Sequence, residues 1–351
     1  MKNIYIICLG LCLLVMTSCG ETSQVLPDTV WQTSLQQSVL PAYEAFAAES
    51  KTLREAIGSF VEKPDSASLT QAQDQWKETA LAWKRAEWLR WGPVKDKDLH
   101  FAFDFQPSRP HLQEVAISAD RPMDSSLVAI QGVAAKGLGG LEVLLFGEKA
   151  PRREILAAFS ADEMPNRRGR FALEVAAELQ RKAGDLVQAA GPAFSSPELQ
   201  GHAGVSQLAN DLLLQLELLK NDKIGRPLGK KKGGQPQAAL AEYGQAELSF
   251  PAMAAQVESI LLAYGGDSTA SLATLLKQGG FTQTDETIRA RFLMVDMKLA
   301  TFTTPLTEAV VTNQQEVETL YDSVADLIQV IKSDLFSQLN IQISFTDADG
   351  D

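Results

Sequence analysis

The sequence predicts an all-α protein. Apolar residues recur every three or four positions over long segments, and the strict alternation of apolar and polar residues that marks a half-buried strand is nearly absent. Short breaks rich in glycine and proline separate these segments. Because amphipathic helices bury their apolar stripes against one another, we expect two helical bundles packed side by side, followed by a short extended tail.

The first predicted helices carry many aromatic residues. A helical pattern begins near Trp31, and Pro64-Asp65-Ser66 is expected to form a turn. The next helix places tryptophans and Glu87 on one stripe. Gly92-Pro93 is expected to end it, because proline cannot continue a helix.

Further helices are predicted along the rest of the chain. Residues 127–146 form one, and residues 167–190 form another that Gly191-Pro192 ends. A helix that Pro197 opens and later helices to residue 339 complete the pattern. In the final segment, residues 340–351, alternate apolar positions favour a strand before an acidic end.

We expect four parts along the chain. Residues 1–18 are a signal peptide and residues 19–30 a polar tether. An N-terminal helical domain over residues 31–192 and a C-terminal helical bundle over residues 193–351 follow. With 351 residues, of which 45% are hydrophobic, the chain is long enough for two medium domains.

The charge balance argues against a nucleic-acid partner. The formal net charge is -12, whereas phosphates favour a basic surface. The basic run Lys230-Lys231-Lys232 is flanked by glycine, so we expect a solvated loop there.

The N-terminal segment resembles a bacterial lipoprotein signal. Lys2 provides a positive start, residues 4–16 are apolar but too short to span a membrane, and two small residues precede Cys19. We expect Cys19 to be the lipidated first residue of the mature protein, and Gly20 after it favours the outer membrane. A plain cleaved signal peptide is the alternative. All three cysteines lie in this segment, so no disulfide is expected in the mature domain.

The most unusual stretch is the apolar run over residues 136–147, with three glycines in its first half. In a helix, Gly139, Glu142 and Phe146 share one face. Each interior glycine costs about 0.8–1 kcal/mol relative to alanine. We therefore expect either a close approach of another backbone or room for a ligand at the glycine face.

This stretch resembles the signature of the imelysin family of secreted and lipid-anchored bacterial proteins. The family pattern is Gly-x-His-x-x-Glu followed by an apolar run that ends in glycine. Gly137, Glu142 and Gly147 match it, whereas Gly139 stands at the histidine position. In the family the histidine and the glutamate look like a metal-binding pair, so the resemblance implies a degenerate metal site here.

Scattered motifs extend the resemblance over about residues 30–351. They include a tryptophan-rich helix ending in Glu and Gly-Pro, an aromatic loop with an aspartate and a proline, a basic-aromatic helix start, and a Glu-to-Ser segment from residue 242 to 249. The resemblance implies a functional cleft between two bundles, lined by the signature helix. The expected cleft residues are Gly137, Gly139, Glu142, Glu87, Asp104, Arg109, Arg168, Arg170, Glu242 and Ser249.

Most of these residues also have a purely structural interpretation. Glu87 on an aromatic stripe is expected to be half-buried and paired with an arginine. Asp104 and Arg109 are expected to brace a buried loop, whose backbone groups need partners. Ser249, followed by Pro251, is expected to cap a helix.

Glu142 needs a partner from outside its own helix. An unpaired buried carboxylate costs several kcal/mol unless it is protonated, paired or bound to a cation. No basic residue lies within one turn on the same helix. We therefore expect Arg109, Arg168 or Arg170 to hold Glu142 in place of a metal.

Three functions remain open. The favoured one is a lipid-anchored binding protein without catalytic residues, metal or cofactor, because the resemblance ties the chain to iron or other nutrient uptake. Its partners would be the membrane, through Cys19, and an envelope uptake system. A metallopeptidase, which the family name implies, is the second, and a structural surface lipoprotein is the third. The metallopeptidase would need a carboxylate-rich metal site from Glu87, Asp104, Glu142 and Glu242.

Histidine chemistry is nearly absent from the sequence. The histidines are His100, His111 and His202, and no Ser-His-Asp or Cys-His arrangement is supported. His111 and Glu114 are spaced like a metal pair but lie at a polar helix start, so we expect them to face solvent.

Overall fold

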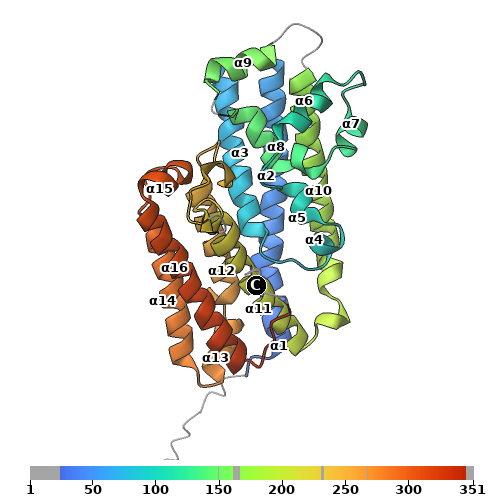
Figure 1. Cartoon of the computed structure of the whole chain (residues 1–351). Coiled ribbons are helices and arrows are strands. Elements are labelled where there is room, and N and C mark those ends of the chain that lie inside the picture. The colour runs from blue at the N-terminus through green and yellow to red at the C-terminus, as the bar shows by residue number, and fades with distance from the viewer. Residues whose placement is uncertain (1–23, 149, 161–166, 231–232, 267, 345–351) are drawn as a thin grey trace, which may run out of the picture.

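The computed structural model describes residues 24–148, 150–160, 167–230, 233–266 and 268–344 (Figure 1). Every regular element in these ranges is helical and none is a strand, so the all-α prediction is confirmed. The N-terminal helices are α1 (Pro27–Ser34), α2 (Leu40–Glu62), α3 (Ser66–Ala86), α4 (Pro93–Asp96), α5 (Leu99–Phe103), α6 (Pro110–Ser118), α7 (Ser125–Ala129), α8 (Gly137–Phe146), α9 (Arg152–Ser160) and α10 (Arg167–Phe194).

The second half of the chain is built in the same way. Its helices are α11 (His202–Leu218), α12 (Ser249–Gly265), α13 (Leu272–Gln278), α14 (Thr282–Leu299), α15 (Leu306–Thr312), α16 (Gln314–Val330) and α17 (Phe336–Gln338). π-Helical turns extend three of the helices, at Leu35–Val39, Leu219–Gly225 and Ile331–Leu335. None of the described helices is long and apolar enough to cross a membrane.

The long helices form two groups that meet along α3. In the first group α2 packs between α3 and α10, and α8 lies against α3 and α10. In the second group α14 lies beside α16 and α12 (Figure 1). Because α12 also packs against α3, side chains from both groups form one continuous apolar core.

The turn between α2 and α3 follows from local chemistry. The Asp65 carboxylate accepts from the backbone N–H groups of Ala67 and Ser68, and the Ser68 hydroxyl accepts from the Asp65 N–H. This reciprocal capping satisfies N–H groups that the first turn of a helix leaves without partners. It fixes the start of α3, whose Trp76 indole donates to the Leu138 carbonyl at 3.0 Å and thereby ties α8 to α3.

The predicted helix over residues 127–146 is interrupted. Helix α7 ends at Ala129, a 3₁₀ turn follows at Val133–Ala135, and α8 begins at Gly137. Gly137 has φ +70°, and a Cβ there would lie 2.6 Å from the Phe103 carbonyl oxygen. Glycine is required at such a position, and this backbone conformation breaks the helix.

Two predicted helix ends are also wrong. Helix α3 ends at Ala86, so Glu87 follows the helix, and Gly92 with φ 58° precedes α4. Helix α10 continues through Pro192 to Phe194. A proline so close to a C-terminus removes only one of the last helical hydrogen bonds, which explains why the helix does not end before it.

The C-terminal tail is not a strand in its described part. Residues 341–344 have no regular structure, and the Asn210 side chain from α11 donates to the Gln342 carbonyl and accepts from the Ser344 N–H. The backbone of this tail therefore hydrogen-bonds to an amide side chain, whereas the predicted strand would hydrogen-bond to a neighbouring strand. Residues 345–351, Cys19 with the rest of the predicted signal, and most of the basic run at 230–232 lie outside the described residues.

Candidate functional site

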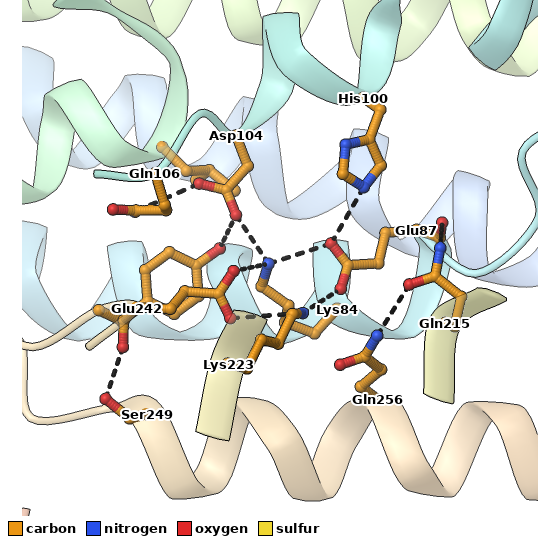
Figure 2. A network of polar contacts seen from close by, with 12 residues as sticks. Lys84, Glu87, His100, Asp104, Gln106, Gln215, Lys223, Glu242, Ser249 and Gln256 are labelled. Carbon is orange, nitrogen blue, oxygen red and sulfur yellow. Dashed lines mark hydrogen bonds and ion pairs between the residues drawn. The ribbon is translucent and has the colours of Figure 1, made fainter. Parts of the chain in front are cut away.

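The last turn of α3 places one lysine at the centre of a buried charge cluster. The Lys84 side chain is 1% exposed, and its Nζ lies 2.7 Å from Asp104 Oδ2, 2.8 Å from Glu242 Oε1 and 3.0 Å from Glu87 Oε2. Figure 2 shows the three carboxylates converging on this nitrogen. An ammonium has three N–H donors, so each carboxylate accepts one hydrogen bond from it.

A second lysine completes the cluster. Lys223 lies in the π-helical turn after α11, and its Nζ is 2.5 Å from Glu87 Oε1 and 3.3 Å from Glu242 Oε2. The Tyr243 hydroxyl donates to Asp104 Oδ2 at 2.7 Å, and the Lys84 Nζ lies 4.9 Å from the centre of the Tyr243 ring. We call these six residues the Lys84 cluster: Lys84, Glu87, Asp104, Lys223, Glu242 and Tyr243.

The electrostatics keep Lys84 and Glu87 charged. Burial alone would lower the pKa of Lys84, but the carboxylates of Asp104, Glu242 and Glu87 together raise it well above its ordinary value. Burial alone would raise the pKa of Glu87, but Lys223 and Lys84 bring it well below the usual range. The Lys84 ammonium and the Glu87 carboxylate therefore stabilise each other's charge in the protein interior.

His100 borders the Lys84 cluster as a neutral imidazole. Burial lowers the pKa of His100 to about 3, more than the Glu87 carboxylate can offset. The Arg90 guanidinium lies 2.8 Å from His100 Nε2 and can only donate, so Nε2 is the acceptor and Nδ1 carries the proton. The approach of His100 Nε2 to Glu87 Oε2, at 3.6 Å, is thus not an ion pair.

Two buried glutamine side chains, Gln215 and Gln256, hold the backbone at Glu87 in place. The Gln215 amide from α11 donates to the Glu87 carbonyl oxygen, and the Gln256 amide from α12 donates to Gln215 Oε1 (Figure 2). Buried backbone groups need such partners where a helix ends. Helices α3, α11 and α12 therefore hold this corner of the site in one arrangement.

A cavity of about 270 Å³ opens next to the Lys84 cluster. Its walls come from the end of α3, from α5 and the loop after it, from the end of α11, and from the segment before α12. The lining residues are Lys84, Glu87, Arg90, His100, Phe101, Asp104, Phe105, Gln106, Pro107, Gln215, Leu218, Asp222, Lys223, Arg226, Leu240 and Glu242.

The structure brings three of the predicted site carboxylates together at this cavity. Glu87, Asp104 and Glu242 all belong to the Lys84 cluster. The expected arginine partner of Glu87 is wrong, since two lysines hold it. Asp104 binds Lys84 and also accepts from Gln106 Nε2, so it does brace this loop. The Arg109 side chain is exposed and takes no part, although the Arg109 N–H donates to the Ala134 carbonyl.

The predicted arginine partner of Glu142 is also wrong. Glu142 Oε1 accepts from the backbone N–H groups of Gln245 and Ala246 at 2.9 and 3.1 Å. Arg168 pairs instead with Glu114 near the surface, and Arg170 is exposed. Burial raises the pKa of Glu142 to about 7, although the two amides partly oppose this shift.

The glycine face of α8 is filled by another backbone. A Cβ at Gly139 would lie 2.7 Å from the Phe105 carbonyl oxygen and 3.0 Å from Gln106 Nε2. Of the two explanations for the glycines, close backbone approach is therefore the one observed. A histidine at position 139 would require the loop at Phe105 and Gln106 to move.

The structure also tests the predictions made for Ser249 and for the pair His111 and Glu114. Ser249 is the first residue of α12 and not its cap, and its hydroxyl donates to the Glu242 carbonyl oxygen. It thereby closes the loop that carries Glu242. His111 and Glu114 are exposed on α6, so the expectation that they face solvent is confirmed.

Sequence reasoning missed both lysines of the cluster. Lys84 lies four residues after Ala80, on the buried stripe of α3, and a lysine on such a stripe indicates a buried partner. Lys223 lies in the π-helical turn after α11, and nothing in its local sequence indicates which carboxylates it meets.

The residues present do not fit a bound metal. Carboxylates are good ligands for hard cations, but here each of them is bound to an ammonium group. Among the described residues, no three histidine, cysteine or acidic side chains are arranged to hold a metal ion. Lys84 occupies the position where the three carboxylates would place a cation.

Comparison with known proteins agrees with this architecture. A solved imelysin-like protein from Psychrobacter arcticum superimposes with a TM-score of 0.77 at 20% identity, covering 91% of this chain and 97% of that one. A structure from Parabacteroides distasonis, named as an iron-regulated protein A precursor, gives a TM-score of 0.73 at 16% identity with the same coverage. At these identities the likeness shows the fold alone.

Sequence comparison establishes the family. Iron-regulated protein A of Synechococcus elongatus is 25% identical over 224 residues, which are 63% of this chain and 60% of that relative's length. The imelysin family model matches residues 39–339, which include α8 and all of the Lys84 cluster. The chain therefore belongs to the imelysin family.

Proposed function

We propose that this chain is a non-catalytic binding protein of the cell envelope whose ligand occupies the cavity beside the Lys84 cluster. The observation that carries the proposal is the position of Lys84 Nζ, within 3.0 Å of three carboxylates. A cation built into the chain neutralises the carboxylates that a metallopeptidase would need as ligands. The adjoining cavity nevertheless has the concave, part-polar and part-apolar lining typical of a small-molecule site.

His100 and Glu87, next to the cavity, are poorly suited to acid–base catalysis. His100, with a pKa lowered to about 3, is not a base that gains a proton near neutral pH. The Glu87 carboxylate accepts from two ammonium groups, which lowers its basicity. A sequence relative named for iron regulation supports a role in iron or other nutrient uptake, in which a binding protein delivers its ligand to an envelope partner.

Metal content and proteolysis test this proposal together. The purified protein is incubated with zinc, iron or calcium, dialysed, and assayed for bound metal and for cleavage of denatured casein. We expect less than about 0.1 metal ion per chain and no cleavage above the buffer control. Stoichiometric, tightly held zinc with casein cleavage would support the metallopeptidase alternative and contradict the proposal.

We also propose that a lipid on Cys19 holds the protein at the outer membrane, on its periplasmic or surface face. The short apolar run before Cys19 supports this anchor. Cys19→Ser should move the protein from the membrane fraction to the soluble fraction after a high-salt wash. Retention of the serine variant in the membrane would contradict lipid anchoring.

A further inference from the structure

One cation at the cavity has no partner in the described part of the chain. Arg226 directly follows the π-helical turn that carries Lys223, lines the cavity and is half-buried. Its guanidinium makes no hydrogen bond or ion pair with any described residue, whereas Lys84 and Lys223 both bind carboxylates. A half-buried arginine without an anion is able to bind one from outside.

The other polar groups of the lining include an unused donor and one acceptor without a hydrogen bond. The three cluster carboxylates accept from Lys84, and Glu87 also accepts from Lys223. Arg90 Nε and Glu242 Oε2 are buried and have no hydrogen-bond partner among the described residues, but Lys223 Nζ forms an ion pair with Glu242 Oε2 at 3.3 Å. Asp222 is the one lining carboxylate outside the cluster, and its charge acts on Arg90. An acceptor group on a ligand therefore suits the donors of Arg226 and Arg90 Nε.

The rest of the cavity wall is apolar and partly open. Phe101 is 49% exposed, and its ring centre lies 6.2 Å from that of Phe105. Leu218 and Leu240 add aliphatic surface to the same cavity. An exposed aromatic side chain beside a polar pocket provides a surface against which a flat apolar group packs.

We propose that the cavity binds a small organic carboxylate with a flat apolar body. The carboxylate pairs with Arg226, and the apolar body lies against Phe101 and Phe105. A cavity of about 270 Å³ is large enough for such a molecule. This assignment rests on the proposed binding function and adds a ligand class to it.

Benzoate is the probe that tests the assignment, because it carries one carboxylate on a flat ring. Its affinity for the full-length protein is measured by titration calorimetry, with benzamidine, which has a cationic group on the same ring, as the contrasting ligand. We expect saturable benzoate binding and no binding of benzamidine at equal concentration. Arg226→Gln should weaken benzoate binding about tenfold or more, since a charge-assisted hydrogen bond is lost.

Arg170→Gln is the matched control, because Arg170 is exposed on α10 and away from the cavity. It should bind benzoate like the wild type, and both variants should unfold at the wild-type temperature without ligand. Absence of benzoate binding, equal binding of benzamidine, or equal affinity of Arg226→Gln and wild type would overturn the ligand class. Casein cleavage with bound zinc would instead overturn the binding function itself, so the two failures are distinguishable.

Discussion

Replacement of Lys84 by methionine should lower the free energy of unfolding by about 3–5 kcal/mol at pH 7, because removing one partner of a buried charge cluster leaves uncompensated charge. Methionine keeps much of the side-chain length, but Glu87 and Glu242 would retain only Lys223 as a paired cation, and Asp104 would have no ion pair left among the described residues. Urea unfolding followed by circular dichroism measures this loss.

Lys182→Met provides the comparison. Lys182 forms an ion pair with Glu178 on α10 and is 22% exposed, against 1% for Lys84. Pairs near the surface contribute about 0–1 kcal/mol, so this variant should stay close to the wild type. Equal losses in the two variants would contradict the central role of Lys84.

A shorter side chain at position 84 provides a test of the cation interpretation. Calcium prefers carboxylate oxygens, and in Lys84→Ala three of them would surround a site that no side chain fills. Added calcium should therefore restore part of the stability of Lys84→Ala and leave the wild type unchanged. An equal effect of calcium on both proteins would show that Lys84 does not occupy a cation position.

The fold was predictable because its main determinant is periodic and local. The stripe containing Trp76 and Trp83 is buried on α3, as the 3.6-residue pattern indicates. The breaks were harder to place, since the predicted helix is interrupted between Ala129 and Gly137, and Gly137 has φ +70° where the Phe103 carbonyl packs close to it. Such a contact depends on a segment that local patterns do not position.

The site was only partly predictable for a related reason. Resemblance to family motifs pointed to Glu87, Asp104 and Glu242, which do meet. Their common partner Lys84 lies 158 residues from Glu242 in sequence, and Lys223 lies 136 residues from Glu87. The partners of Glu142 are backbone N–H groups, which every residue except proline carries. The types of side chain in the sequence therefore do not predict which residues bind Glu142.

Glu142→Gln should make the protein's stability less dependent on pH. Burial raises the pKa of Glu142 in the folded protein to about 7, from an ordinary value of 4.5. Between these values the folded protein holds a proton that the unfolded chain releases, so the free energy of unfolding falls as pH rises. The stabilisation is complete below about pH 4.5 and lost above about pH 7, which amounts to about 3 kcal/mol at 1.36 kcal/mol per pKa unit.

Glutamine is neutral throughout this range, and its side-chain oxygen is still able to accept from the N–H groups of Gln245 and Ala246. Urea unfolding at pH 5 and pH 8 should therefore show a fall in stability that is about 2.5 kcal/mol larger for the wild type than for Glu142→Gln, because a small part of the effect is already lost at pH 5. Asp211, whose pKa burial raises to about 6, contributes equally to both proteins and cancels in this difference. Glu44→Gln, at an exposed position of α2, should follow the wild type. If Glu142→Gln also follows the wild type, Glu142 is ionised in the folded protein at pH 5, and its two backbone hydrogen bonds outweigh its burial.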